Sequence, residues 1–250
     1  MIDVHCHLLP GVDDGPADLD AALALVKASA SNGISHAICT PHIYPGRWDN
    51  GYANLQPALQ QLRQAMAAAN VPLQLKLGAE VRVCDQLPQL IQAGRIPMLG
   101  HVNGYDILLL EMPDHQIPAG LWQLIPWLMR HKVRPLIAHP ERNKAVMSDI
   151  SQAQRLHRAG CWLQVTTGAV LGSFGSRAQA TAQQLLDDDL VYLLATDTHN
   201  LKARQPNMAQ AHQWLSRRFD SGYADMLTHD HPALLYHSTP QSIPTLEDAP

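Results

Sequence analysis

The chain has 250 residues, of which 46% are hydrophobic, and its formal net charge at pH 7 is −4. This composition is typical of one large α/β domain with an ordinary apolar core, and the lack of a basic stripe argues against a nucleic-acid partner. The chain contains no run of about 18 apolar residues. It opens on MIDVHCH rather than on a charged and apolar leader, so we expect no membrane insertion and a cytoplasmic location.

The predicted elements alternate between strand and helix. Apolar runs of strand length are followed by segments with apolar residues at helical spacing, as Leu19, Leu23 and Val26 illustrate. In chain order we expect strand 2–7, helix 18–32, strand 34–40, helix 53–69, strand 72–80, helix 85–93, strand 107–111, helix 121–131, strand 133–139, helix 149–159, strand 161–165, helix 176–187, strand 191–195 and helix 203–217.

Seven strand–helix units without a low-complexity linker predict a parallel sheet. Because polar residues follow most of the strands, we favour a closed or nearly closed TIM-like barrel over an open doubly wound sheet, which the alternation alone also allows. The barrel is expected to cover 1–220. Residues 221–250 are expected to form a C-terminal extension, and its prolines predict that the final dozen residues are flexible.

The four cysteines, Cys6, Cys39, Cys84 and Cys161, show no metal-finger spacing, and most of them fall within strand-like runs. We therefore expect buried, reduced thiols, as in a cytoplasmic protein. None of them is followed by an arginine at the six-residue offset of the usual phosphate-binding loop of cysteine phosphatases. This spacing argues against a cysteine nucleophile.

Imidazole and carboxylate side chains recur at or just past the carboxyl ends of the predicted strands. In a barrel of alternating strands and helices, these ends meet at the rim where the chemistry takes place. Each residue alone can be explained as an ordinary loop or turn residue, but the repetition on six strands predicts a metal-binding rim. The nine candidate ligands are His5, His7, Asp14, His42, Glu80, Glu111, His139, Asp197 and His199.

The local patterns support this prediction. His5 and His7 are two residues apart on a strand, so both side chains project from the same face. Glu80 and Glu111 close apolar strands, where burying a carboxylate is costly unless a cation or a hydrogen-bond donor compensates. Asp13, in the turn after the first strand, either joins the site or stabilises the turn through its own backbone.

The types of ligand also limit the metal ions. Imidazole and carboxylate without thiolate suit Mn²⁺, Fe²⁺ or Zn²⁺ and discriminate poorly among them. The nine ligands exceed what one ion needs. Two ions would require a bridging carboxylate, and three would use the whole set.

Arginines follow the candidate ligands in the same loops. Arg142 comes three residues after His139, and Arg204 comes seven residues after Asp197. We expect both guanidinium groups to bind and neutralise a phosphoryl group while metal ions activate a water molecule. Arg47, in the loop after the second strand, is a third candidate for substrate binding. A solvated loop arginine is the alternative for each of the three.

These residues resemble those of the PHP (polymerase and histidinol phosphatase) superfamily. More narrowly, the chain resembles the bacterial metal-dependent protein-tyrosine phosphatases of capsule and exopolysaccharide loci. The resemblance extends from residue 1 to about residue 208, which is most of the chain. Six ordered motifs carry it: MIDVHCHLLPGVDDGP, CTPHIYPGRWDN, LGAEV, LLLEMP, AHPERN and TDTHNLKARQPNM.

The resemblance implies a distorted (β/α)₇ barrel that holds three divalent metal ions, with Mn²⁺ favoured and Fe, Zn or Mg as alternatives. It implies one ion on His5, His7, Glu80 and Asp197, a second on Glu80, Glu111 and His139, and a third on Asp14, His42 and His199. Arg142 and Arg204 match the phosphate-contacting arginines, and together with Asp197 they make up the implied catalytic residues. A hydroxide that bridges metal ions would be the nucleophile, without a phosphoenzyme.

Two positions depart from the pattern of this branch. Asn143 stands where an aromatic residue is common, and Thr198 stands where a small residue is usual. Both are expected to flank the substrate mouth. They therefore bear on substrate preference rather than on metal binding.

Our leading hypothesis is a metal-dependent phosphatase that acts on phosphotyrosine in a protein substrate, in particular a bacterial tyrosine kinase of polysaccharide biosynthesis or export. The alternative within the same superfamily is a small-molecule phosphoesterase of the histidinol-phosphate or nucleotide type. A non-catalytic metal-binding module accounts less well for a complete ligand set with two arginines. A nuclease accounts less well for the missing basic surface.

Overall fold

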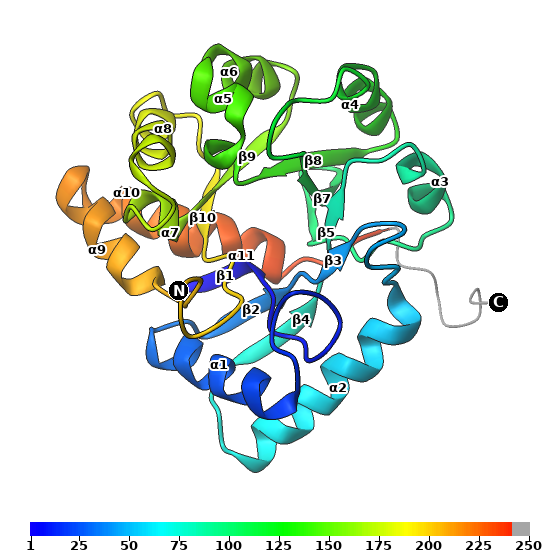
Figure 1. The fold of residues 1–250 in the computed structure, drawn as a ribbon, viewed down its shortest axis with the longest axis vertical. Helices are drawn as coiled ribbons and strands as arrows, with labels where there is room; N and C mark the ends of the chain where they lie inside the picture. The colour runs from blue at the N-terminus through cyan, green and yellow to red at the C-terminus, as the bar shows by residue number, and fades with distance from the viewer. Residues whose placement is uncertain (242–250) are drawn as a thin grey trace.

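The computed structural model describes residues 1–241 and shows central strands surrounded by helices (Figure 1). The described strands are β1 (Ile2–Cys6), β2 (His36–Cys39), β3 (His42–Ile43), β4 (Gln74–Leu77), β5 (Glu80–Arg82), β6 (His101–Val102), β7 (Tyr105–Glu111), β8 (Val133–Ala138), β9 (Trp162–Thr166) and β10 (Leu193–Ala195). The described helices are α1 (Leu19–Ser31), α2 (Tyr52–Ala68), α3 (Leu87–Gln92), α4 (Leu121–Arg130), the 3₁₀-helix η1 (Pro140–Arg142), α5 (Lys144–Ser148), α6 (Ser151–Arg158), α7 (Thr167–Val170), α8 (Ser176–Asp187), α9 (Met208–Arg218), α10 (Ser221–Asp225), the π-helix η2 (Met226–Asp230) and α11 (His231–Tyr236).

The strands form two sheets that continue into each other. One sheet has the order β1-β2-β4 and the other has the order β10-β9-β8-β7-β5-β3, with parallel pairing along both. β6 adds an antiparallel pair to β7. Where β2 passes into β3 and β4 into β5, Gly78 N donates to Cys39 O (2.8 Å) and Glu80 N donates to Pro41 O (3.2 Å). The two sheets are therefore connected through these interrupted strands.

Two backbone hydrogen bonds join β1 to the residues that follow β10. His7 N donates to Thr198 O at 2.9 Å, and Asp197 N donates to His5 O at 2.8 Å. These bonds link the two outer strands, as the closure of a barrel requires. The predicted α/β fold with parallel strands is confirmed, and the bonds are compatible with the predicted distorted barrel.

The predicted strand at 72–80 is wrong as a single element, because the chain leaves strand geometry at Gly78 between β4 and β5. A Cβ atom at Gly78 would lie 2.7 Å from Ile38 Cγ2 and 2.8 Å from Leu99 Cδ2, so any larger residue would force these side chains to shift. Beyond the break, β5 pairs with β7 and not with β2. The break therefore moves Glu80 into the second sheet, at the edge where the candidate ligands gather.

Two helical regions also differ from the prediction. The helix expected at 203–217 begins only at Met208, because Pro206 lacks a backbone N–H and disfavours helical geometry in the residue before it. The sequence pattern does not predict α5, which Asn143 caps by accepting hydrogen bonds from Ala145 N (2.9 Å) and Val146 N (3.2 Å). In the described part of the chain, no helix has the length and apolar character needed to cross a membrane.

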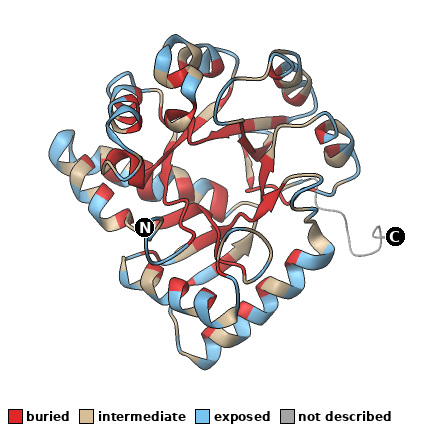
Figure 2. Cartoon of the chain, viewed as in Figure 1, coloured by how far each residue is buried: buried red, intermediate tan, exposed pale blue. Residues whose placement is uncertain are grey.

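The core lies between the strands and the inner faces of the helices. Figure 2 shows buried strands, whereas the helices alternate between buried and exposed faces. α1 illustrates the pattern: Asp18 caps it by accepting a hydrogen bond from Ala21 N at 2.9 Å, and Leu25 and Val26 pack with Leu75 of β4. Burying one such side chain contributes about 1.5–3 kcal/mol. This packing fixes the strands whose ends carry the candidate ligands.

The C-terminal extension packs against the strands through α11. Leu235 and Tyr236 join an apolar cluster with Ile2 and Val4 of β1. The close approach depends on Gly100, where a Cβ atom would lie 2.4 Å from Leu235 O. The boundary expected near residue 220 remains a prediction. The flexibility expected for the final dozen residues falls, from residue 242 onward, outside the described residues.

Candidate metal centre

All nine predicted ligands come together at the carboxyl ends of the strands. Eight of them form three groups in which one nitrogen or oxygen atom per residue lies within 4.8 Å of the others. The groups are His5, His7, Glu80 and Asp197; His7, Asp14, His42 and His199; and His42, Glu80 and Glu111. The ninth residue, His139, lies against the cluster with its Nε2 atom 2.8 Å from Glu80 Oε1.

Two of these residues lie just beyond a strand, at sharp turns of the backbone that are called corners below. His139 follows β8 and Asp197 follows β10, and their φ angles are +34° and +52°. Residues other than glycine rarely adopt this left-handed conformation, and strain of this kind concentrates at functional sites. The hydrogen bond from Asp197 N to His5 O holds the second corner against β1.

Asp13 orients His7. Its Oδ2 atom lies 2.7 Å from His7 Nδ1 and also accepts a hydrogen bond from His42 N at 3.0 Å. An ionised carboxylate can only accept, so His7 Nδ1 carries a proton. Asp13 also stabilises the turn after β1, because its Oδ1 atom accepts a hydrogen bond from Gly15 N at 2.9 Å.

The other ring nitrogen of His7 faces the cluster. His7 Nε2 lies 3.2 Å from Glu80 Oε2 and 3.5 Å from Asp197 Oδ1. These acceptors need a positive charge between them, which a proton or a metal ion can supply. Without a metal ion, burial lowers the pKa of His7, but Asp13 and Glu80 outweigh this effect and raise the pKa to about 9. A metal ion would replace that proton.

Four buried polar atoms of the cluster have no hydrogen-bond partner among the described residues. Leaving such an atom unpaired costs about 1–3 kcal/mol, so it is rare in folded proteins. Metal coordination would satisfy all four. The atoms are Glu80 Oε2, Asp197 Oδ1, His42 Nδ1 and His199 Nε2. Imidazole nitrogens and carboxylate oxygens without thiolate fit Mn²⁺, Fe²⁺ or Zn²⁺.

Two candidate ligands are held as neutral imidazoles. Burial and the positive charge of Arg142 lower the pKa of His139 to about 4. Burial and the neighbouring His7 lower the pKa of His199 to about 4. A neutral imidazole keeps the lone pair that binds a metal ion. Burial and the charge of Glu80 raise the pKa of Glu111, as expected for a carboxylate placed where a cation would compensate it.

The two predicted phosphate-binding arginines meet on Asp197. Arg142 Nη1 lies 2.8 Å from Asp197 Oδ2, and Arg204 Nη2 binds the same oxygen. The other oxygen, Oδ1, lies 3.2 Å from His5 Nε2. The side chains of Arg142 and Arg204 remain 21% and 24% exposed, so both can reach a ligand that enters from solvent.

The ring of Trp48 separates Arg47 from the candidate ligands. It is exposed, and its guanidinium carbon lies 4.0 Å from the centre of the Trp48 ring. Trp48 in turn stacks on His42, with ring centres 4.7 Å apart and planes 9° from parallel. The structure thus places Arg47 beside the rim without a direct contact to the nine ligands.

Asn143 and Thr198, which were expected to flank the substrate mouth, support the loops around the site. Both are buried. Asn143 caps α5 and donates hydrogen bonds to Pro113 O (2.8 Å) and Gln116 O (3.1 Å), while Thr198 Oγ1 donates to Arg204 O at 2.7 Å. Each polar side chain satisfies backbone groups nearby, and the expected place of both residues beside the substrate mouth remains a prediction. These two residues hold the loops that surround the site.

Sequence reasoning missed Arg82 and Gln164, whose polar side chains contact candidate ligands. Arg82 Nη1 lies 3.1 Å from Glu111 Oε2, and Gln164 Oε1 lies 2.8 Å from His5 Nδ1. Arg82 is two residues after Glu80 on the same strand, so its position on the ligand-bearing face was available from the strand period. The signal for Gln164 was a lone amide within a buried apolar strand.

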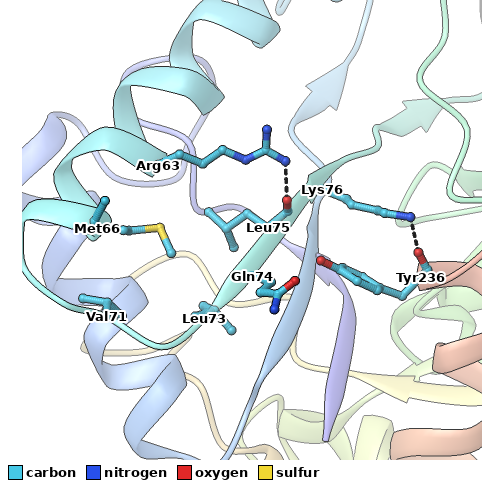
Figure 3. Close-up of a pocket in the computed structure, with 9 residues that line it drawn as sticks. Arg63, Met66, Val71, Leu73, Gln74, Leu75, Lys76 and Tyr236 are labelled. Atoms are coloured by element: carbon cyan, nitrogen blue, oxygen red, sulfur yellow. Dashed lines mark hydrogen bonds between the residues drawn. The ribbon is translucent and has the colours of Figure 1, made fainter.

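A separate cavity of about 390 Å³ lies between α2 and β4, beside Tyr236 (Figure 3). Its two cationic residues bind backbone carbonyls: Arg63 Nη2 donates to Leu75 O at 2.5 Å, and Lys76 Nζ donates to Tyr236 O. The residues that line it include none of the nine candidate ligands. The candidate chemistry therefore belongs to the rim.

The fold and the site together define a class of proteins, in which parallel α/β strands carry candidate metal ligands at their carboxyl ends. A family model described as capsular polysaccharide synthesis, CpsB/CapC, matches residues 1–237. The chain belongs to the CpsB/CapC family. The resemblance to the phosphatases of capsule loci is thereby confirmed.

Two known relatives match along nearly their whole length. Tyrosine-protein phosphatase YwqE of Bacillus subtilis (strain 168) is 32% identical over 239 residues, which cover 96% of this chain and 93% of YwqE. Tyrosine-protein phosphatase CpsB of Streptococcus pneumoniae is 28% identical over 241 residues, which cover 93% of this chain and 96% of CpsB.

Solved structures agree with these matches. A structure from crystallographic work on YwqE and CpsB, which describes them as unique metal-dependent tyrosine phosphatases, has a TM-score of 0.88 and 30% identity over 96% of both chains. The phosphotriesterase homology protein from Escherichia coli has a TM-score of 0.57 at 15% identity, covers 94% of this chain, and shares the fold alone.

Proposed function

We propose that this protein is a metal-dependent phosphatase that hydrolyses phosphotyrosine in protein substrates. The observation that carries the proposal is that the two carboxylate oxygens of Asp197 face different groups. Its Oδ1 atom faces His5 and His7 in a candidate metal group, whereas its Oδ2 atom binds Arg142 and Arg204. This arrangement puts two phosphate-binding cations next to the candidate metal ligands, and the names of the matched relatives support phosphotyrosine as the substrate.

The metal ions are assigned to the ligands by group. His5, His7, Glu80 and Asp197 would hold one ion, and Asp14, His42 and His199 would hold another. Glu80 would be shared with a third ion, held by Glu111 and His139. Mn²⁺ is the proposed ion, and the donor set also suits Fe²⁺ or Zn²⁺. When bound, such ions lower the pKa of water and polarise a phosphoryl oxygen.

The protein's own residues supply binding and charge. Arg142 and Arg204 bind the phosphoryl oxygens of the substrate and neutralise the negative charge that builds up there. Asp197 holds both guanidinium groups in place before the substrate arrives. His139 and His199 stay neutral near pH 7 because their pKa values are lowered to about 4. No side chain of the rim is required as a covalent nucleophile.

The substrate is proposed to be a bacterial tyrosine kinase of polysaccharide biosynthesis or export, dephosphorylated in the cytoplasm. Family membership in capsular polysaccharide synthesis supports this assignment. Arg47 is proposed as an outer contact for the substrate, because it is exposed and stands on Trp48 beside His42.

The test is the release of phosphate from a phosphotyrosine peptide by chelator-treated enzyme, before and after Mn²⁺ is added back. We expect release that depends on Mn²⁺. If the peptide stays intact while a small phosphate monoester is cleaved, the substrate is a metabolite and the phosphotyrosine proposal fails. If neither substrate is cleaved although Mn²⁺ binds, the protein is a metal-binding module.

A further inference from the structure

We infer that Gln164 is a positioning residue of the metal centre, which holds His5 in its metal-binding tautomer and ties it to the backbone corner at His139. The inference rests on the metal-binding part of the proposed function and is independent of the identity of the substrate. It starts from a buried amide on a strand where an apolar side chain would be expected.

Gln164 lies in the middle of β9 and is fully buried. Its neighbours along the strand, Leu163 and Val165, belong to the main apolar cluster. Because side chains alternate along a strand, Gln164 points to the opposite face from these two residues, where His5 lies. Burying an amide costs free energy unless hydrogen bonds compensate, so its presence indicates a specific role.

One oxygen atom of Gln164 receives two N–H groups. Oε1 lies 2.8 Å from His5 Nδ1 and accepts a longer hydrogen bond from His139 N at 3.4 Å. The backbone N–H of His139 can only donate, so the amide oxygen rather than the nitrogen faces this pair. His5 Nδ1 must therefore carry a proton.

The consequence is that His5 presents Nε2 to the cluster. Nε2 lies 3.2 Å from Glu80 Oε2, 3.2 Å from Asp197 Oδ1 and 3.4 Å from His7 Nε2. With both histidines protonated on Nδ1, their Nε2 lone pairs converge with two carboxylate oxygens on one region. A cation is the partner that suits all four atoms at once.

The same oxygen links two parts of the site. His5 belongs to the group with Asp197, whereas His139 contacts Glu80 Oε1 at 2.8 Å. Gln164 therefore connects a ligand on β1 with the corner after β8, where the left-handed backbone of His139 needs support. Its other amide atom, Nε2, has no hydrogen-bond partner among the described residues. Since only the oxygen is used, an acceptor at this position is what the site requires.

The test compares Gln164→Met, which keeps the volume but removes the strong acceptor, with Gln164→Glu, which keeps an acceptor oxygen. Gln179→Met is the matched control, because Gln179 is a half-buried glutamine on α8 that donates to Val170 O. Mn²⁺ affinity is measured by titration calorimetry on chelator-stripped protein. We expect Gln164→Met to weaken Mn²⁺ binding at the group that contains His5 by about 10–100-fold, because such supporting partners have effects of that size. Gln164→Glu and Gln179→Met should retain affinity within about threefold, since both keep an acceptor for His5.

A purely structural role has a different signature. In that case Gln164→Met would lower the melting temperature of the metal-free protein and leave Mn²⁺ affinity at the wild-type value, which would overturn the inference. If Gln164→Met does not fold, Gln164→Asn provides the same comparison, because its shorter side chain keeps the amide but withdraws it from His5. Wild-type affinity in that variant would also overturn the inference.

The proposed function fails separately. If the wild-type protein binds Mn²⁺ but leaves phosphotyrosine intact, the phosphotyrosine proposal is wrong. The Mn²⁺ affinities of the variants still test the role of Gln164 in that case. If the wild-type protein binds no divalent ion, both the proposed metal centre and the inference about Gln164 are wrong.

Discussion

Asp197 is the residue at which the proposed metal-binding group and the proposed phosphate-binding arginines meet. Its carboxylate is fully buried, with one oxygen toward His5 and His7 and the other toward two guanidinium groups. Burial alone would raise its pKa, but His5 and the two arginines hold the pKa well below its usual range. The residue therefore stays ionised throughout the range in which the enzyme is expected to work.

Replacing Asp197 should abolish activity. We expect Asp197→Ala to reduce phosphate release by on the order of 100-fold or more, because the change removes a ligand and the anchor of both arginines. The far-UV circular dichroism spectrum should stay that of the wild type. Asp187→Ala is the matched control, since Asp187 pairs with Arg218 on the surface at 3.0 Å. Full turnover by Asp197→Ala would refute the metal model.

The cysteines should differ in reactivity. Cys6, Cys39 and Cys161 are buried and Cys84 is partly exposed, and all four are free thiols. We expect iodoacetamide at pH 8 to modify Cys84 alone in the folded protein, as mapped by peptide mass spectrometry. Modification of Cys161 as fast as Cys84 would contradict the burial that the structure shows.

The reactivity of Cys161 should also depend on pH. Burial raises its pKa to about 12 from an ordinary value of 9.0, so the folded state favours the neutral thiol. The contribution of this group to stability is then complete below pH 9 and is lost as the pH rises through about 12. Native-state labelling of Cys161 should accordingly begin only in the alkaline range.

At the scale of elements, interrupted strands build the site. β2 passes into β3 and β4 into β5, and each second half pairs in the sheet that leads to β7. The interruption at Gly78 moves Glu80 to the carboxyl edge, where the three groups of candidate ligands meet. A regular strand through this region would keep Glu80 in register with the first sheet.

Filling the space at Gly78 should destabilise the protein. A Cβ atom there would lie under 3.0 Å from Ile38 Cγ2 and Leu99 Cδ2, so Gly78→Ala should lower the free energy of unfolding by about 1–3 kcal/mol. Urea unfolding measures the change. Gly120→Ala is the control, because Gly120 has helical dihedral angles and no atom within 4 Å of the added methyl group. Equal stability of the two variants would contradict the close packing.

Over the whole molecule the net charge is only −4, but many charged side chains are concentrated around the candidate metal centre. Five carboxylates and three arginines surround the cluster of histidines. They are Asp13, Asp14, Glu80, Glu111, Asp197, Arg82, Arg142 and Arg204. Without bound cations, such a centre has buried polar atoms that are unpaired. The stability of the folded protein should therefore depend on metal binding.

Metal removal should therefore lower the melting temperature. An ion at 100 times its dissociation constant adds about 2.7 kcal/mol per site, which corresponds to about 5–10 °C for a domain of this size. Differential scanning fluorimetry in chelator and then in Mn²⁺ measures the shift. His5→Ala should show a smaller shift because it loses a ligand of one group. Identical melting temperatures of the wild type with and without Mn²⁺ would contradict the linkage.

The class of fold and the nine candidate ligands could be predicted from sequence patterns. Alternating strand and helix patterns predict parallel strands, and residues at strand ends must gather at one edge of such a sheet. His5, Glu80 and Asp197 could be named for this reason, although they are far apart in the chain. Arg142 and Arg204 followed from their place in the same loops and from the family motifs.

The contacts among these residues could not be predicted from the sequence and became visible in the three-dimensional structure. The grouping of ligands, the two arginines on Asp197 Oδ2 and the contact of Gln164 with His5 depend on distances between strands, which no local pattern specifies. The break at Gly78 depends on packing against Leu99, a residue from a different part of the chain. Periodicity reports which face a side chain occupies, whereas its partners are set by the three-dimensional packing of separate strands.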